Sequence, residues 1–541
     1  MTGRGRPGPV DEKQAHWKWA HGLLLLLQAG ALFCIARLTS FEHGFPLDDA
    51  WIHQVVGRTL AETGVLGYTP ERFGSAATSL AWGAIVAINH AWLGMEPALF
   101  AFLVNAALFI GTGQLWLAML RRDGAPLAAA FGTAVLASTA SNFVWFALSG
   151  MESMLLVFLS TLTIWLWTEP GERSRLRAWG AGVTLGLLFL TRPEAGGLLG
   201  VLVVALPWTR RPPRDLIAVA TPCLVAVAGY AFSMATATGD ARPSTLEGRR
   251  VMWFQDVPTA GPLELAGRML SMWGDRLAEH TLALSSSRLL FWTVLGLSLG
   301  GAFVVLQHRW VRFGTLVAWG AAHIAVYMVL LPTTGHGGRY QPLTPALFTG
   351  LAWVGLWTIA SAAWTRYSLP TKARGFAMVA LTIALAAPSV RSLRAWGHAH
   401  HDAVTHIWDT EVAMGRVVAE LPATATIASF DIGGIGYFGN RELIDLGALV
   451  DASLAVALRD SDAWPLLDER GVDYVVMPEG FGHAFPDPWN FYWRLGLHKQ
   501  PAARLVELER FASSVAVWKR GVEASLHGAP VQVLYQVESA P

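Results

Sequence analysis

The chain has 541 residues, of which 53% are hydrophobic and only 15% are charged, and its formal net charge is +1. Soluble proteins of ordinary composition carry about 25% charged residues, so this composition excludes an ordinary soluble protein and favours a membrane protein. The near-zero net charge indicates no particular partner, and we expect no nucleic acid among the partners. Both cysteines, Cys34 and Cys223, fall in apolar runs, where we expect small buried side chains rather than a disulfide framework.

The N-terminal region predicts a cytoplasmic tail followed by a membrane anchor. Residues 1–19 form the tail, which begins with the basic segment "TGRGRPGP", expected to be disordered. The next run, "GLLLLLQAGALFCIARL", lacks a small-residue cleavage site, so we expect a signal anchor that stays in the membrane.

Apolar segments long enough to cross a membrane recur along the first 394 residues. A spanning helix needs roughly 20 mostly apolar residues, and on this measure about eleven helices are predicted. They lie around residues 20–40, 97–120, 125–146, 151–168, 178–192, 195–209, 215–236, 288–307, 313–332, 340–361 and 375–392. Within "LTRPEAGGLLG", Pro193 and the glycines predict a tight turn between short helices.

Positive charges in the short loops orient these helices with the N-terminus inside. The cytoplasmic side receives Arg121, Arg122, Arg312 and the segments "GERSRLR", "TRRPPRD" and "TRYSLPTKAR". The opposite turns are nearly free of positive charge, except for Arg192 and Arg339.

This orientation divides the chain into domains. We expect an α-helical polytopic membrane protein whose transmembrane domain covers residues 20–394 and whose C-terminal α/β domain, residues 395–541, lies outside the cell. Two outer loops of the transmembrane domain are too long to be turns, and they cover residues 41–96 and 237–287.

The first outer loop contains two adjacent carboxylates at the start of a predicted helix over residues 48–62. The helix is amphipathic, with Ile52 and Val56 on its apolar face and His53 on the other, so it is expected to lie along the membrane surface. Asp48 and Asp49 have two interpretations. Helix capping explains one of them, but adjacent carboxylates repel each other, which leaves one free for chemistry.

The C-terminal part has a different pattern. Short β-rich runs, "TATIASFDIGGIGYFGNRELIDL" and "GVDYVVMPEG", alternate with helix-like stretches such as "DAWPLLDER". The glycines of "DIGGIGYFG" allow either a phosphate-cradling loop or a turn after a strand, and the lack of a GxGxxG or Walker pattern favours the turn.

Charged and polar groups also stand at the outer ends of several predicted spans. Such groups are costly at the membrane boundary and tend to face a polar cavity, so they are candidates for function. For Arg192 and its acidic neighbours, an ion pair that only ties helices together is an equally consistent interpretation. In "HGGRY" the glycines allow close backbone approach, and the cationic side chains suit a phosphate. The group comprises Glu152, Arg192, Glu194, His336, Arg339 and Tyr340, with Arg242, Arg249 and Arg250 in the second outer loop as possible additions to a basic pocket.

The motifs "PLDDAWIHQVVGRTLAETG", "ALSGMES", "LTRPEAG", "GGRYQPLTPAL" and "DIGGIGYFGNRELIDLGALVD" occur in the order seen in a known family. In this order the chain resembles the GT-C-type integral membrane glycosyltransferases, and within them the bacterial AftB-like, arabinofuranosyltransferase-related branch. The resemblance covers nearly the whole chain.

The resemblance implies an inverting enzyme that takes a sugar from a polyprenyl-phosphate carrier and adds it to an extracytoplasmic glycan, lipid or protein. The location implied is a bacterial-type inner membrane, with the active site on the periplasmic side. Asp48 is expected to be the base and Asp49 to assist, and the two together could hold a divalent cation such as Mg or Mn. The donor phosphate is assigned to Arg339, His336, Tyr340 and Arg58, and supporting polar roles to His53, Glu71, Arg72, Glu152, Arg192, Glu194 and Arg242.

Two other functions are open at this point. A catalytically silent GT-C-like scaffold would keep the fold without the activity. A transporter would predict inverted repeats and broken helices with polar residues near the bilayer midplane, whereas the charges here gather on one side.

Overall fold

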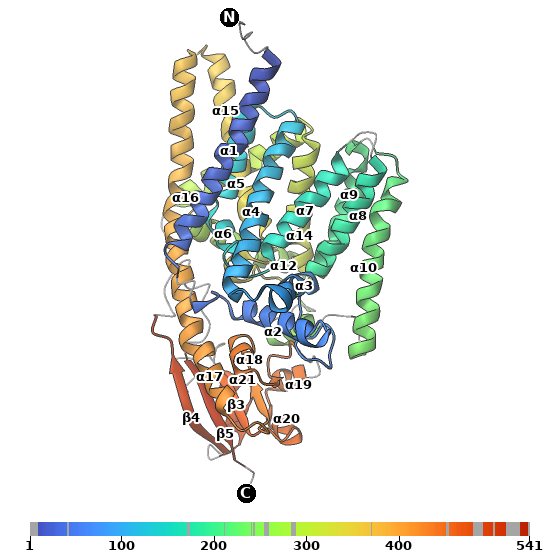
Figure 1. Ribbon diagram of the computed structural model, residues 1–541. Coiled ribbons are helices and arrows are strands. Elements are labelled where there is room, and N and C mark those ends of the chain that lie inside the picture. Colours follow the sequence, from blue (N-terminus) through green and yellow to red (C-terminus); the bar gives the residue numbers. More distant parts are fainter. Residues whose placement is uncertain are drawn as a thin grey trace, which may run out of the picture.

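A computed structural model of the chain describes residues 9–39, 43–169, 174–209, 211–239, 241, 244–253, 259–282, 288–368, 370–450, 454–479, 491–500, 504–515 and 531–538. Figure 1 shows a bundle of long helices and, at the end opposite the N-terminus, a smaller unit that contains all the labelled strands. The helices of the bundle are α1 (Pro9–Ala36), α4 (Pro97–Arg122), α5 (Leu127–Ser138), α6 (Ser141–Phe146), α7 (Ser153–Thr168), α8 (Ser174–Thr191), α9 (Leu198–Thr209), α10 (Asp215–Thr238), α13 (Arg288–Gln307), α14 (Val311–Leu330), α15 (Leu343–Arg366) and α16 (Thr371–Ile407).

Six helices in the described part of the chain are long and apolar enough to cross a membrane. They are α1, α4, α10, α13, α14 and α15. The other predicted spans are also helical, but α5, α7 and α9 are shorter apolar helices. The structure therefore supports a multi-pass membrane protein, while the count of eleven spans and their orientation stay predictions.

Several predicted boundaries are corrected by the structure. Residues 9–19 are helical and belong to α1, whereas their cytoplasmic location stays a prediction, and the segment "TGRGRPGP" lies almost wholly outside the described residues. The predicted span over 125–146 is broken into α5 and α6, because Ala140 has extended backbone angles. Cys34 is exposed on α1 rather than buried, although Cys223 is buried as expected. The predicted tight turn is present, since a short 3-10 helix, η3 (Pro193–Gly197), joins α8 to α9.

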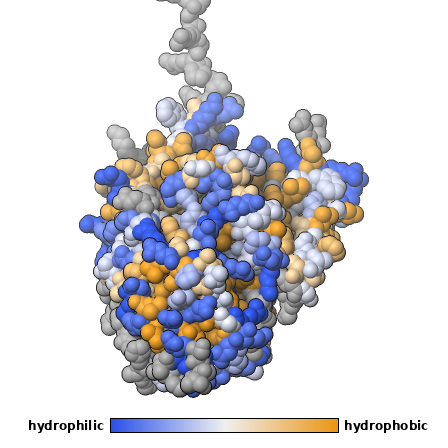
Figure 2. Space-filling view, turned by 60° about the horizontal axis from the view of Figure 1, so that its bottom comes forward, coloured by the Kyte–Doolittle hydropathy of each residue, from blue (hydrophilic) through white to orange (hydrophobic). Residues whose placement is uncertain are grey.

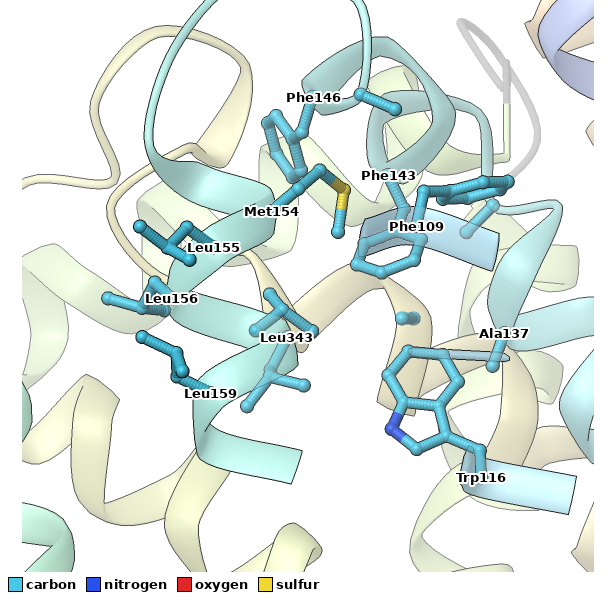
Figure 3. Close-up of a cluster of buried hydrophobic side chains, with 14 of the residues drawn as sticks. Phe109, Trp116, Ala137, Phe143, Phe146, Met154, Leu155, Leu156, Leu159 and Leu343 are labelled. Carbon is cyan, nitrogen blue, oxygen red and sulfur yellow. The ribbon is translucent and has the colours of Figure 1, made fainter. Parts of the chain in front are cut away.

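The bundle is held together by a core of aromatic and aliphatic side chains. Figure 3 shows Phe109 and Trp116 of α4, Phe143 of α6 and Leu343 of α15 among these residues. All four side chains are at most 1% exposed. In a membrane-spanning bundle, close van der Waals packing of such large side chains, rather than removal of apolar surface from water, holds the helices together.

The two predicted outer loops form helices that lie where the bundle meets the C-terminal unit (Figure 1). The first loop contains α2 (Asp48–Thr63), α3 (Leu80–Ile88) and η2 (Asn89–Leu93), and the second contains α11 (Ser244–Trp253), α12 (Pro262–Asp275) and η4 (Arg276–Thr281). The predicted helix over 48–62 is thus present. Its polar face is not exposed, however, because His53 is 3% exposed and Gln54 is fully buried. Protein covers α2 on both faces, so the expected position flat on a membrane surface is replaced by one between two parts of the chain.

The C-terminal unit is an α/β domain built on one five-stranded sheet. Its strands are β1 (Ile427–Ser429), β2 (Leu443–Asp445), β3 (Tyr474–Glu479), β4 (Leu505–Ala512) and β5 (Val531–Val537), in the order β2-β1-β3-β5-β4. β1 is parallel to β2 and β3, whereas β5 is antiparallel to β3 and β4. The remaining elements are η6 (Trp408–Val412), α17 (Ala413–Glu420), α18 (Gly434–Gly439), α19 (Ala455–Arg459), α20 (Trp464–Glu469), α21 (Phe491–Arg494) and η8 (Leu497–Lys499).

The pattern of the C-terminal part is confirmed in its first half. The β-rich runs form β1, β2 and β3, and "DAWPLLDER" contains α20. The proposed domain boundary at residue 395 falls inside α16, which continues to Ile407, so the helix connects the two parts rigidly. Figure 2, turned to bring this end of the molecule forward, shows an apolar area with hydrophilic residues beside it.

Candidate active site

A small pocket opens where α2 and α11 meet the ends of bundle helices. Its lining combines acidic, basic and imidazole side chains with a few apolar ones. The lining residues are Asp49, Ile52, His53, Ala76, Thr78, Met151, Glu152, Arg192, Thr245, Arg249 and Leu449. Five of the lining residues are expected from the sequence as site residues or as part of a basic pocket, namely Asp49, His53, Glu152, Arg192 and Arg249.

Asp49 stands in the first turn of α2 and faces two arginines. Arg339 Nη2 donates to Asp49 Oδ2, and Arg249 Nη2 lies 3.5 Å from the same oxygen. Desolvation raises the pKa of Asp49, but the charges of Arg339 and Arg249 outweigh this effect and hold the pKa well below its usual range. Asp49 is therefore a charged carboxylate, and its side chain is still 27% exposed to the pocket side.

Arg339 has unused hydrogen-bonding capacity. Its residue is only 3% exposed, and Nε and Nη1 are buried without a hydrogen-bond partner among the described residues. A buried N–H without a partner costs about 1–3 kcal/mol, so this guanidinium is poised to receive an additional anion. His336 adds positive charge near Asp49 when it is protonated.

The ring of Tyr340 lies close to three arginines of the site. The guanidinium carbons of Arg192, Arg249 and Arg339 lie 4.8, 5.4 and 5.4 Å from the centre of its ring. Arg249 also donates to the Tyr340 hydroxyl. An aromatic face attracts cations, so this ring, together with the acidic partners of these arginines, partly offsets the repulsion among the three like charges.

A buried polar network forms the wall beside Asp49. His53 follows Asp49 by one helical turn, and its Nε2 lies 3.1 Å from Glu152 Oε2. The other oxygen of Glu152 accepts from Arg192 Nε at 2.9 Å, and Arg192 also donates to Tyr327 at 2.8 Å. Glu194 accepts from Tyr327 and pairs with Arg192 at 3.3 Å. The network ties α2, α7, α8 and α14 together, which is the structural role that the sequence left open for Arg192.

Asp48 points away from this pocket. Its Oδ2 accepts from the Gly433 N–H at 2.9 Å, and its Oδ1 accepts from the Gly434 N–H at 2.6 Å. Both glycines belong to "DIGGIGYFG", so this segment is the predicted turn after a strand, β1, and its N–H groups hold a carboxylate of the same chain. Desolvation and the nearby Asp431 raise the pKa of Asp48 to about 8, against the lowering effect of the two backbone donors.

Asp48 belongs to a group of three acids, with Asp431 and Glu411, and this group predicts a pH-dependent stability. Desolvation, with the charge of Asp49 adding, raises the pKa of Asp431 to about 6, and desolvation with the charge of Asp431 raises that of Glu411 well above its ordinary value. The folded chain thus binds more protons than the unfolded chain between about pH 4 and pH 8, so the free energy of unfolding falls as the pH rises through this window.

The measurement is the thermal unfolding midpoint of the detergent-solubilised protein at pH 5, 6, 7 and 8. We expect the midpoint to decrease by several degrees over this range. Asp431→Asn should flatten the decrease, because it removes one of the titrating groups and its repulsion of Asp48. The exposed Asp460 provides the matched control, Asp460→Asn, which should keep the wild-type slope. A midpoint that rises with pH would contradict the assignment.

Other predicted site residues lie elsewhere. Arg58 donates to the carbonyls of Tyr437 at 3.0 Å and Gly436 at 3.4 Å instead of lining the pocket. Glu71 is exposed, and the Arg72 carbonyl accepts from Ser75 in the same loop. Arg242 lies outside the described residues.

Sequence reasoning missed Tyr327 and Leu449. Tyr327 stands in an apolar helix with no charged neighbour in sequence, and Leu449 is an ordinary aliphatic residue in a loop of the C-terminal domain. Neither position carries a local pattern that could have indicated the site.

The donor set does not fit a metal ion. The described residues contain no group of three or more His, Cys, Asp or Glu side chains that could hold one. Moreover, both oxygens of Asp48 accept backbone N–H groups, and Oδ2 of Asp49 faces two arginines, so these three oxygens face donors and not a cation.

The chain has the fold of solved membrane glycosyltransferases. It is similar to the archaeal oligosaccharyltransferase AglB from Archaeoglobus fulgidus, solved with an inhibitory peptide and a dolichol-phosphate, with a TM-score of 0.53 and 12% identity over 84% of this chain and 69% of that chain. It is also similar to ArnT from Cupriavidus metallidurans bound to undecaprenyl phosphate, with a TM-score of 0.52 and 15% identity over 95% of this chain and 98% of that chain.

These likenesses support the predicted GT-C-like fold, and at such low identity they show the fold alone. The mycobacterial arabinofuranosyltransferase AftD has a TM-score of 0.42, with 16% identity over 96% of this chain and 40% of that chain, which is too low to support the AftB-like branch. Residues 402–524 match a family model described as a domain of unknown function (DUF8728). No curated protein has a significantly similar sequence.

Proposed function

We propose that the chain is a membrane glycosyltransferase that moves a sugar from a polyprenyl-phosphate carrier to an extracytoplasmic acceptor, with inversion. One observation carries this proposal: an ionised carboxylate, Asp49, shares a pocket with Arg339, a buried arginine that has unused N–H donors. The two groups are those that the reaction needs, a proton acceptor for the acceptor hydroxyl and a cation for the departing phosphate. The lipid phosphates bound to AglB and ArnT, which share this fold, support the choice of carrier.

Asp49 is our candidate for the base. The sequence expectation named Asp48 for this role, but the contacts favour Asp49, because Asp49 lines the pocket whereas the carboxylate of Asp48 is held by Gly433 and Gly434. In the reaction, Asp49 takes the proton of the acceptor hydroxyl as that oxygen bonds to the anomeric carbon. The bond from this carbon to the phosphate oxygen breaks, and its electron pair stays with the lipid phosphate.

Arg339, Arg249, His336 and Tyr340 are our candidates for the phosphate site. The two arginines hold Asp49 in the free protein, which makes it a weak base. A donor phosphate competes with Asp49 for the same guanidinium groups, so donor binding raises the basicity of Asp49 at the moment when the base is needed. No step of this scheme requires a metal ion.

The site lies at the end of the bundle that carries the C-terminal domain, so we place the reaction on the outer side of a bacterial-type plasma membrane. The acceptor is a glycan, lipid or protein on that side. The polyprenyl tail of the donor would stay in the bilayer beside the helices, with its phosphate at the boundary, where Arg339 and Arg249 lie beside Asp49.

The experiment that tests this function has two parts. Mass spectrometry of lipid extracted from the purified protein should find a polyprenyl phosphate, with or without a sugar. The purified protein in lipid nanodiscs, incubated with synthetic polyprenyl-phosphate sugars and a cell-envelope glycan fraction, should then transfer label to the glycan. Bound carrier without transfer from any sugar donor would favour the scaffold function. Labelled donor that crosses the membrane of sealed proteoliposomes containing the protein, without transfer, would favour a transporter.

A further inference from the structure

The glycine-rich segment 431–439 makes contacts with α2 that the proposed reaction does not explain. It runs from the end of β1 through α18, in the C-terminal domain, and it packs on α2, in the first outer loop of the bundle domain (Figure 1). Two parts of the chain that are 385 residues apart in sequence meet here. The contact is therefore an interface between domains, and Asp48 at this contact is the neighbour in sequence of Asp49, which lines the pocket.

The centre of this interface is the carboxylate of Asp48. Each of its oxygens accepts one backbone N–H, from Gly433 at 2.9 Å and from Gly434 at 2.6 Å. A side chain at position 433 would overlap the carbonyl oxygen and the carboxylate of Asp48, so only glycine fits. The segment is thus shaped to receive this one acid.

Further contacts fix α2 in the same place. The Tyr68 hydroxyl donates to the Ile432 carbonyl at 2.7 Å, and a side chain at Gly436 would overlap that hydroxyl. Arg58 reaches the Tyr437 carbonyl at 3.0 Å and lies over the Tyr437 ring at 4.9 Å. These bonds hold both ends of α2 and the loop that follows it.

A second segment of the C-terminal domain reaches the pocket itself. Asp445, at the end of β2, accepts from the N–H groups of Gly447, Leu449 and Val450 and so folds the loop that follows. The Leu449 carbonyl accepts from the Ala76 N–H at 3.1 Å, and both residues line the pocket. The C-terminal domain therefore supplies part of the pocket wall.

We propose that Asp48 is a positioning residue: the glycine segment 431–439 holds its carboxylate, and this contact fixes the first turn of α2 and aims Asp49 at Arg339. The C-terminal domain is then a part of the catalytic unit and not a separate acceptor-binding module. Asp48 and Asp49 are neighbours on one helical turn, so a shift of the first moves the second by a similar amount. Misplacement of a catalytic group by 1 Å can cost about a hundredfold in rate. The catalytic half of this inference depends on the proposed function, whereas the docking half does not.

The test measures docking and catalysis separately in the full-length protein. Hydrogen–deuterium exchange of the backbone amides of α2 reports docking. Gly433→Ala and Asp48→Ala should each raise this exchange at least tenfold, and Gly267→Ala, where a side chain meets open space in α12, should leave it unchanged. Tyr68→Phe, which removes only the bond to Ile432, provides a milder variant that should raise the exchange by a smaller factor.

Catalysis is measured as kcat and the donor KM of the same variants. We expect kcat to fall at least tenfold in Gly433→Ala and Asp48→Ala, with the donor KM within twofold of wild type. Asp48→Asn keeps one oxygen acceptor, so its kcat should lie between those of wild type and Asp48→Ala, and its pH profile should keep the wild-type shape.

Each outcome decides one part of the inference. Unchanged exchange in Gly433→Ala, Asp48→Ala and Tyr68→Phe overturns the docking role. If exchange rises but kcat does not change, the positioning role is overturned. If Asp48→Asn is as slow as Asp49→Asn and its pH profile loses the acidic limb, which reports the general base, Asp48 is itself the base. A wild-type protein that transfers no sugar refutes the proposed function, and the exchange data still decide the docking.

Discussion

Replacing Asp49 by Asn is expected to slow sugar transfer by about 10²–10⁴-fold, because the amide cannot accept the proton of the acceptor hydroxyl. The same change should affect binding in the opposite direction. Asp49 competes with the donor phosphate for Arg339 and Arg249, so without its charge both arginines are free for the donor. We therefore expect a lower donor KM together with the lower kcat. This combination is unusual for a binding residue, whose loss raises KM.

The measurement is the steady-state rate of transfer from a labelled polyprenyl-phosphate sugar in nanodiscs, at several donor concentrations. Glu62→Gln is the matched control, because it makes the same carboxylate-to-amide change on an exposed position of the same helix. The control should keep wild-type kinetics. A donor KM that rises in Asp49→Asn, or a rate within threefold of wild type, would contradict the role of Asp49 as base.

The sequence singles out several of the residues that line or border the pocket because its charges are rare. In a chain with 15% charged residues, Asp49, Glu152, Arg192 and Arg339 stand out beside apolar runs, and charges at such a boundary tend to face a polar cavity or to pair with each other. The order of motifs along the chain also led to the fold, which the likeness to AglB and ArnT now supports.

The sequence could not predict which of the two aspartates lines the pocket and which one contacts the C-terminal domain. Local pattern treats Asp48 and Asp49 as equals at the start of one helix, and only tertiary contacts separate them. The partners of Asp48 are backbone N–H groups of Gly433 and Gly434, which no residue pattern reveals. Likewise, the burial of His53 on the polar face of α2 follows from a second domain that covers the helix. Periodicity reports which face is apolar, but it does not report what a polar face meets.

Replacing Arg339 by Met is expected to lower kcat by about 10²–10³-fold, which corresponds to about 3–4 kcal/mol of transition-state stabilisation. The physical reason is the negative charge that grows on the phosphate oxygen as the sugar leaves. Arg339 is 3% exposed, and two of its nitrogens have no hydrogen-bond partner in the described part of the chain, so its charge acts at short range with little screening by water. Arg339→Lys should recover part of the rate, because a lysine keeps the charge but loses the fork of donors. Arg459→Met, at an exposed position of the C-terminal domain, is the matched control and should be fully active.

A double substitution separates the two effects of Arg339, on the phosphate and on Asp49. In the free protein Arg339 lowers the pKa of Asp49, so Arg339→Met should shift the acidic limb of the pH–kcat/KM profile upward. Asp49→Asn removes that limb altogether, and Arg339→Met in this background should then change only the leaving-group step. Because the two residues contact each other, their effects should not add, and we expect the double variant to be at least tenfold faster than the product of the two single losses. Strict additivity would mean that Asp49 and Arg339 act at separate places, and the single pocket on which the proposed reaction depends would be refuted.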